Sequence, residues 1–221
     1  AHVIAGLAGV AMSRRDYATA RRQMLAALEL RRSINNVGSI AISLTSLGEL
    51  ARREGELAEA KRYLAEGLAY CRDFGDAEHI AWNLYNTGLV AIGQRDSAAA
   101  ARALAECLSL RVSQGNPVEI ANTVAAIAGL ARLSSEVATA AELWGAVVAI
   151  RREHGAGSSS DEDAEAEREM LRAVHRGLGD SAVAGRLAGG DTIPLSEAVR
   201  RAEEFVAGTA KLLAAADEDH Q

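Results

Sequence analysis

The sequence predicts an all-α protein built from helical hairpins that stack side by side into an α-solenoid, and three observations support this fold class. First, the 221 residues include 47 alanines but only two prolines, and 4% are aromatic, a composition that favours helices over sheets. Second, the sequence repeats itself with a period of 40 residues from residue 1 to about residue 155. Third, apolar residues within each copy recur at helical spacing.

The 40-residue repeat contains no gap and places both small and large residues in register. Alanine and isoleucine return at fixed positions, and large apolar residues return at two more, with coincidences in every copy. The recurring sets are Ile40, Ile80 and Ile120; Ala1, Ala41, Ala81 and Ala121; Ala11, Ala51, Ala91 and Ala131; Ala20, Ala60, Ala100 and Ala140; Met24, Leu64, Leu104 and Trp144; and Leu28, Leu68, Leu108 and Val148.

Each copy is predicted to be a hairpin of two helices, with signals at both helix ends. An acidic residue stands where the second helix should begin, and it can accept hydrogen bonds from the free N–H groups there. Asparagine or glycine, which readily adopt the left-handed conformation, stands where that helix should end. Pro117 follows one such end, where it can open the next helix. The acids are Asp16, Glu56, Asp96 and Glu136, and the expected ends are Asn35, Gly75, Gly115 and Gly155.

Small residues are expected where the two helices of a hairpin cross. Gly48 and Gly88 should face Ala60 and Ala100, so that the helix backbones approach closely. Because one amphipathic hairpin cannot bury its apolar face, stacked neighbours should complete a continuous core and form a curved solenoid.

The spacing of these residues resembles the tetratricopeptide motif. The matching residues are Leu44, Leu47, Gly48, Ala51, Gly55, Ala60 and Leu64, and Asp16-Tyr17 with Ala20 resemble the same turn in the first copy. The resemblance implies a right-handed α-solenoid of four tetratricopeptide-like repeats over 1–39, 40–79, 80–119 and 120–155. The sequence departs from the family in its 40-residue period, where 34 is usual, and in lacking the closing proline.

Residues 156–221 should form a linker followed by C-terminal capping helices. The string GAGSSSDED (155–163) is polar and ends in an acidic helix start. Helical spacing resumes at Met170, Leu171, Val174 and Leu178, a short segment covers 181–188, and Thr192 to Pro194 open a last helix. Its apolar stripe is Leu195, Val199, Ala202, Phe205 and Val206. We expect these helices to pack on the fourth hairpin as a cap.

This C-terminal region carries a second resemblance. The strings AAELWGAVVAIRREHGA and GDTIPLSEAVRRA resemble the C-terminal end of bacterial signal-transduction ATPases and LuxR-type transcriptional activators, except at Val183 and Leu187, where bulkier aromatics are usual. The resemblance implies a cytoplasmic regulator in which an ATPase core precedes the helical domain. The chain begins at Ala1 without a methionine, so we expect a fragment of a longer protein.

Charge and motifs argue against several function classes. Residues 1–160 carry a net charge of +1 and residues 161–221 a net charge of −7, so no basic patch predicts contact with nucleic acid. The longest apolar run, 143–150, is too short to span a membrane. No phosphate-binding loop, zinc motif or nucleophile motif is present, so we expect no cofactor, no metal and no enzymatic activity.

The remaining reactive side chains favour structural roles. His79 and His154 stand near predicted helix ends, where capping or solvated roles are expected. Cys71 and Cys107 are expected to be buried, reduced thiols. Glu54 and Glu56 form a carboxylate pair, but in an exposed turn rather than in an apolar pocket.

A binding groove is the best-supported candidate site. In tetratricopeptide folds the first helix of each hairpin lines the concave groove, and Trp82 and Tyr85 are two aromatics one turn apart on such a helix. The alternative interpretation is that they only fill the groove by packing. The positions predicted to be exposed there are Ile42, Thr45, Glu49, Arg52, Trp82, Tyr85, Asn86, Leu89 and Asn122.

The sequence therefore predicts a protein-interaction and effector-sensing domain of a bacterial transcriptional regulator or signal-transduction ATPase. Its partner would be a protein, a peptide or a small effector. The alternative is a free-standing scaffold that binds peptides or assembles a complex. The apolar residues Val3, Ile4, Leu7 and Val10 also predict self-association through the N-terminal edge.

Overall fold

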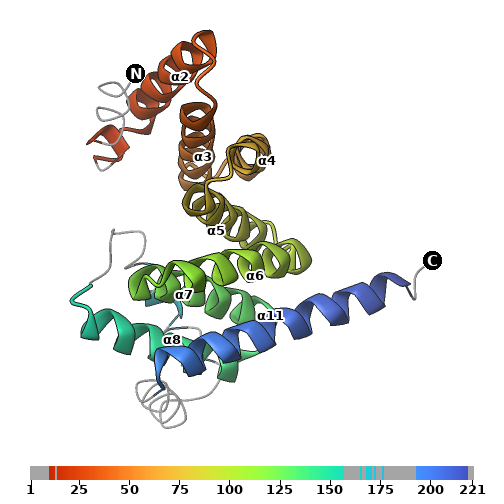
Figure 1. Ribbon diagram of the computed structural model, residues 1–221. Coiled ribbons are helices and arrows are strands. Elements are labelled where there is room, and N and C mark those ends of the chain that lie inside the picture. Colours follow the sequence, from red (N-terminus) through yellow and green to blue (C-terminus); the bar gives the residue numbers. More distant parts are fainter. Residues whose placement is uncertain are drawn as a thin grey trace. The chain divides into compact units, whose positions relative to one another are not determined.

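The structure is a computed structural model that describes residues 10–12, 14–156, 165, 168–170, 172, 176 and 193–218, with side chains up to residue 211 (Figure 1). All regular secondary structure among these residues is helical. The chain divides into two compact units, Ala1–Gln94 and Arg95–Gln221.

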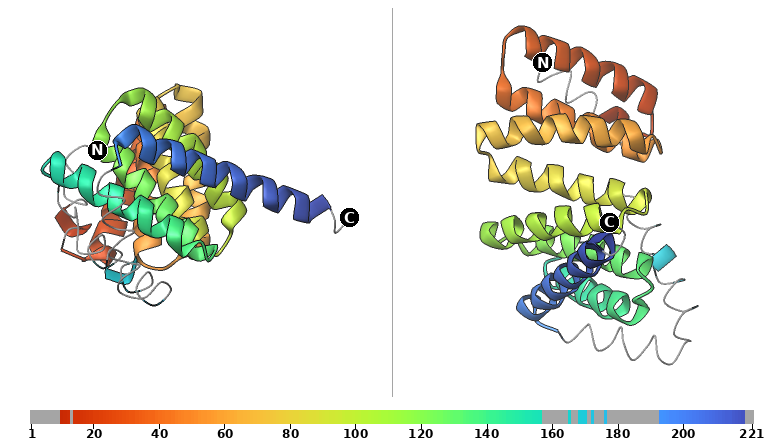
Figure 2. Two further views of the ribbon diagram at one scale, coloured as in Figure 1. Left: turned by 90° about the horizontal axis from the view of Figure 1, so that it is seen from below. Right: turned by 90° about the vertical axis from the view of Figure 1, so that its right-hand side faces the viewer.

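The first unit contains four long helices that pack in chain order. They are α2 (Tyr17–Ser33), α3 (Val37–Arg53), α4 (Leu57–Phe74) and α5 (Ala77–Gly93). Each packs against the next, and α3 also packs against α5 (Figure 2). Met24 and Leu28 of α2 meet Leu44, Leu47 and Leu50 of α3 in one buried apolar cluster. The predicted helical hairpins of this region are thus joined through the apolar face of α3.

The second unit contains α6 (Ser97–Gln114), α7 (Pro117–Leu133), α8 (Val137–Glu153) and α11 (Leu195–Glu218). The helices α6, α7 and α8 pack consecutively, and α11 lies against all three of them (Figure 1). Ala198, Ala202 and Val206 form the buried side of α11. The last helix therefore contacts both helices of the expected fourth hairpin, and α6 in addition.

The 40-residue period of the sequence is also the period of the helices. The helices α2, α4, α6 and α8 begin at residues 17, 57, 97 and 137, and α3, α5 and α7 begin at 37, 77 and 117. Within each compact unit, the 40-residue sequence repeat thus corresponds to a repeated pair of helices joined by a short turn.

The predicted helix ends are confirmed. Asn35, Gly75, Gly115 and Gly155 all have positive φ angles, between 50° and 73°. A second set of residues with left-handed backbone conformation, which the sequence did not suggest, follows the first helix of each hairpin, at the position of Gly55. In the other copies this position holds Arg15, Arg95 and Ser135, all of which also have positive φ.

The predicted N-caps are correct for aspartate and wrong for glutamate. Asp16 and Asp96 accept hydrogen bonds from the backbone N–H groups of Thr19 and Ala99. Glu56 and Glu136 occupy the same position but make no capping hydrogen bond, because the extra methylene carries the carboxylate past the N–H groups. The first helices carry caps that the sequence reading missed, namely Asn36, Asp76 and Asn116.

The crossing of α3 and α4 depends on the absence of a side chain at Gly48. A Cβ atom there would lie 2.6 Å from Leu64 Cγ and 3.4 Å from the carbonyl oxygen of Ala60. This confirms the prediction that Gly48 faces Ala60.

Several predictions lie outside the described residues. They concern Val3, Ile4 and Leu7 at the N-terminus, most of the 155–163 connector, Leu171, Val174 and Leu178, the segment 181–188 with Val183 and Leu187, Thr192, and the last residues 219–221. Among the helices that are described, no segment is both long enough and apolar enough to cross a membrane.

Candidate functional site

Eight of the nine candidate residues belong to the first unit, on α3 and α5, which pack against each other. Six of the eight are partly exposed, and we call this set the α3–α5 face. It consists of Ile42, Glu49 and Arg52 on α3 and Trp82, Tyr85 and Leu89 on α5. The face therefore combines four apolar or aromatic side chains with two charged side chains near the end of α3.

Thr45 and Asn86 were predicted to be exposed, and this prediction is wrong. Thr45 is 0% exposed and Asn86 is 2% exposed. The Thr45 hydroxyl donates to the carbonyl oxygen of Ala41 at 3.1 Å, and the Asn86 amide donates to the carbonyl oxygen of Trp82 at 3.1 Å. Asn83 of α5 and Gly67 of α4 lie against Thr45, and the Asn86 amide is bonded within α5. Neither side chain therefore belongs to the accessible surface of the face.

A buried polar pair joins the two helices beneath this face. The Asn83 amide nitrogen donates to Thr45 Oγ1 at 2.9 Å, and both residues are 0% exposed. Gly67 of α4 covers the pair, since a Cβ atom at Gly67 would lie 3.0 Å from Asn83 Nδ2 and 3.2 Å from Thr45 Oγ1. The pair is therefore enclosed by three helices, and it fixes how α5 lies on α3.

Sequence reasoning did not identify Asn83, although a signal was present. Ser43, Asn83 and Thr123 occupy the same position of successive copies, and all three are buried polar residues. A polar residue that recurs on the apolar side of a helix indicates a buried hydrogen bond.

The start of α5 places a hydrogen-bonded histidine–aspartate pair next to Trp82. His79 Nδ1 lies 2.6 Å from Asp76 Oδ2, and the His79 and Trp82 rings meet edge to face with centroids 6.2 Å apart. Partial burial raises the pKa of Asp76, but hydrogen bonds from the His79 side chain and from the backbone N–H groups of His79 and Glu78 outweigh it, so the pKa is lowered overall. The predicted helix-end role of His79 is confirmed.

The charged side chains of α3 are engaged within the protein. Arg53 donates to one carboxylate oxygen of Glu49 through Nε at 3.1 Å and Nη2 at 2.9 Å. The aromatic residues Trp82 and Tyr85 are therefore the distinctive chemical feature of the α3–α5 face.

Asn122, the ninth candidate, lies on α7 in the second unit and has a local partner. Its side-chain oxygen accepts a hydrogen bond from Arg151 of α8 at 2.9 Å. The guanidinium of Arg151 also lies over the Trp144 ring, 5.9 Å from its centroid. The amide oxygen of Asn122 thus links α7 to α8 through this hydrogen bond.

The cysteines and the second histidine match their predicted structural roles. Cys71 and Cys107 are both buried and neither forms a disulfide, and burial raises the pKa of both thiols. His154 stands at the end of α8, with Nδ1 3.0 Å from the carbonyl oxygen of Ile150. Within the described part of the chain, no three His, Cys, Asp or Glu side chains converge closely enough to hold a metal ion.

The sequence placed Glu54 in an exposed turn, but its side chain is only partly exposed. It lies at the end of α3 and accepts hydrogen bonds from Arg21 of α2. A neighbour 33 residues away therefore defines its environment.

The sequence matches no model of a known protein family and no curated protein.

Proposed function

We propose that this chain is an interaction and sensing domain that binds a protein or peptide partner, or a small effector, on the α3–α5 face. The observation that carries this proposal is the pairing of Trp82 and Tyr85, one turn apart and partly exposed on α5. Large aromatic side chains supply much contact area at low entropic cost, and they dominate the binding energy of many interfaces.

The support beneath the aromatics favours binding over simple packing. The buried Asn83–Thr45 hydrogen bond holds α5 against α3, and the Asn86 side-chain amide donates a hydrogen bond to the backbone carbonyl oxygen of Trp82. A face whose backbone is fixed in this way loses little further entropy when it binds a partner.

The proposed architecture is a right-handed α-solenoid of four tetratricopeptide-like repeats with a C-terminal helical cap. Its support is the 40-residue register of seven helix starts, together with the packing of α11 on α7 and α8. In such an arrangement the first helices of the hairpins, α3 and α5 among them, line the binding surface.

The proposed parent is a cytoplasmic bacterial transcriptional regulator or signal-transduction ATPase, as the C-terminal sequence resemblance implies. Binding at the α3–α5 face would regulate such a parent only if the partner has different affinities for its inactive and active states.

A peptide selection tests the proposal. A phage-displayed library of random peptides would be selected on the chain, and the tightest peptide would be titrated by calorimetry. We expect the double variant Trp82→Ala/Tyr85→Ala to bind that peptide at least about ten-fold more weakly, since two interface aromatics together commonly contribute more than this.

Phe74→Ala is the matched control. Phe74 is an aromatic residue at the end of α4, is 61% exposed and lies outside the α3–α5 face, so its removal should leave the affinity unchanged. Equal affinity of the wild type and the double variant, with both folded by circular dichroism, would refute the proposal.

A further inference from the structure

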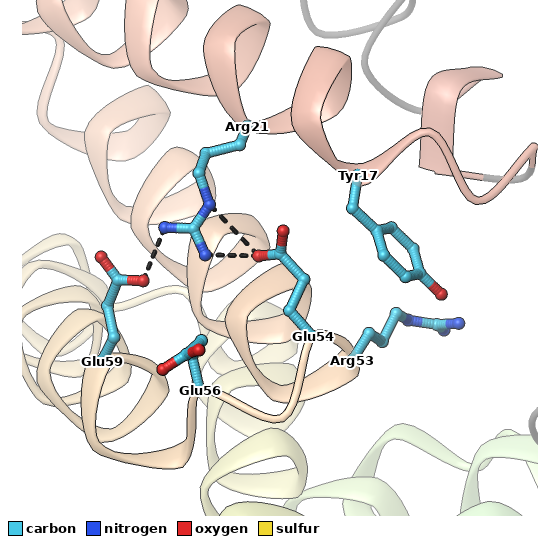
Figure 3. Close-up of a pocket in the computed structure, with 6 residues that line it drawn as sticks. All are labelled: Tyr17, Arg21, Arg53, Glu54, Glu56 and Glu59. Carbon is cyan, nitrogen blue, oxygen red and sulfur yellow. Dashed lines mark hydrogen bonds and ion pairs between the residues drawn. The ribbon is translucent and has the colours of Figure 1, made fainter.

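A second surface of the first unit has a different chemistry from the α3–α5 face. A cleft of about 690 Å³ lies between the start of α2 and the turn that joins α3 to α4 (Figure 3). Tyr17 and Arg21 line it from α2. Arg53 and Glu54 at the end of α3, with Glu56 and Glu59 at the start of α4, complete the lining.

One guanidinium group already occupies part of this cleft. Arg21 projects from α2 between two carboxylates, donating to Glu54 through Nε and Nη2 and to Glu59 through Nη1 at 2.5 Å (Figure 3). These hydrogen bonds raise the pKa of Arg21 further above its ordinary value, although partial burial opposes this effect. The cleft is thus suited to a planar cation with several N–H donors.

The lining keeps an excess of hydrogen-bond acceptors after these bonds are made. Both bonds from Arg21 to Glu54 reach the same oxygen, Oε2, which leaves Oε1 as an acceptor. Arg53 is bonded to Glu49 outside the cleft. Glu56 stands at the N-cap of α4 without making a capping hydrogen bond. Both oxygens of Glu59 are engaged, since Arg21 donates to Oε2 and Arg62 Nη2 lies 3.7 Å from Oε1. Glu54 Oε1 and the Glu56 carboxylate therefore remain as acceptors in the lining.

This combination belongs to one junction of the repeat. At the equivalent positions of the next copy, Leu57 replaces Tyr17, Lys61 replaces Arg21, Gln94 replaces Glu54 and Ala99 replaces Glu59. An acid at the position of Glu56 recurs in every copy, and Lys61 keeps the positive charge of Arg21. The common hairpin pattern does not require Tyr17, Glu54 or Glu59, and their presence here calls for a separate explanation.

We infer that this cleft binds an arginine side chain in a basic segment of a partner protein. The carboxylates of the cleft are spread along its wall, and among the described residues they do not converge as metal ligands. A guanidinium has five donors in one plane and can bridge such separated acceptors, whereas a metal ion needs them around one point. Tyr17, which packs against the apolar cluster on one side, also lines the cleft, and a tyrosine ring can stack on a guanidinium.

The binding test uses short labelled peptides as probes. Fluorescence anisotropy would follow fluorescein-labelled tetra-arginine and tetra-lysine at about 50 mM salt, where charged contacts are weakly screened. We expect tetra-arginine to bind several-fold more tightly than tetra-lysine. Equal affinities would contradict the inference, because they would indicate attraction by net charge alone.

Glu56→Gln locates the site, since Glu56 makes no capping bond whose loss could unfold α4. The expected loss of tetra-arginine affinity is about five-fold, the effect of removing one partly exposed charge-assisted contact. Glu29→Gln, on an exposed position of α2, removes the same charge elsewhere and should change nothing. Equal effects of the two substitutions would overturn the inference.

The double variant Trp82→Ala/Tyr85→Ala separates this inference from the proposed function. It should bind tetra-arginine as the wild type does, because neither aromatic residue lines the cleft. A parallel loss in this variant would show that the peptide binds the α3–α5 face, and the cleft would then be rejected as its site.

Discussion

Asn83 of α5 donates a hydrogen bond to Thr45 of α3 across 38 residues of sequence, at 2.9 Å and out of contact with solvent. Because both groups are buried, the Asn83 amide depends on Thr45 as an acceptor, while the Thr45 hydroxyl itself donates to the carbonyl oxygen of Ala41. The pair therefore specifies one way of packing α5 on α3, and with it the geometry of the face that carries Trp82 and Tyr85.

Replacing either partner alone should lower the free energy of unfolding, and replacing both should lower it by less than the sum of the two single changes. We expect Asn83→Leu and Thr45→Val each to lower the free energy of unfolding by about 1–2 kcal/mol, since each leaves a buried polar group without its partner. The double variant should cost less than the sum of the single ones. Urea denaturation of all four proteins measures this coupling, and strictly additive effects would show that the hydrogen bond does not matter.

Two glycines in helices should respond to alanine in opposite ways. Gly48→Ala should lower the free energy of unfolding by about 1–3 kcal/mol, because the new Cβ atom would lie 2.6 Å from Leu64 Cγ. Gly208→Ala in α11 should raise it by about 0.5–1 kcal/mol, because the site is open and alanine favours helix. Thermal and urea denaturation test both changes. A stabilising Gly48→Ala would contradict the close approach of α3 and α4.

Acid should weaken the folded second unit through Glu197. Hydrogen bonds from Arg200 and then Arg201 lower its pKa from 4.5 to about 2, and Arg201 also donates to Glu142 of α8 at 2.8 Å. Because the folded pKa is lower than the unfolded one, the stabilisation is fully present above about pH 4.5 and is lost as the pH falls toward 2.

Glu197→Gln should therefore flatten the dependence of stability on pH within this window, as measured by urea denaturation at a series of pH values. Glu203→Gln, an exposed position on the same helix, serves as the control for net charge. An unchanged pH dependence in Glu197→Gln would show that the contacts of Glu197 with the two arginines do not contribute.

The helix pattern could be predicted from sequence because its signals are local. Apolar spacing, Pro117 and the left-handed residues Asn35, Gly75 and Gly115 act within one or two turns of the chain. Because the sequence repeats every 40 residues, the same local signals recur in each copy. The glutamate caps failed for the same reason: the sequence showed an acid at Glu56 and Glu136, while capping depends on side-chain length.

The candidate site was predictable only in part. Helical spacing placed Trp82 and Tyr85 correctly on an accessible side of α5, but it could not show that packing in the folded chain buries Thr45 and Asn86. The cleft depends on contacts from Arg21 to Glu54 and Glu59, which are 33 and 38 residues away. Such pairings arise from how successive hairpins pack, and no local sequence pattern records them.

The most direct test of the proposed function is amide hydrogen exchange of the chain with and without a saturating concentration of the peptide selected from the random library. Binding at the α3–α5 face predicts that slowed exchange is concentrated in Val37–Arg53 and Ala77–Gly93, and that this slowing is absent from Trp82→Ala/Tyr85→Ala. Slowed exchange confined to α11, or to α2 and α4, with α3 and α5 unchanged, would contradict it.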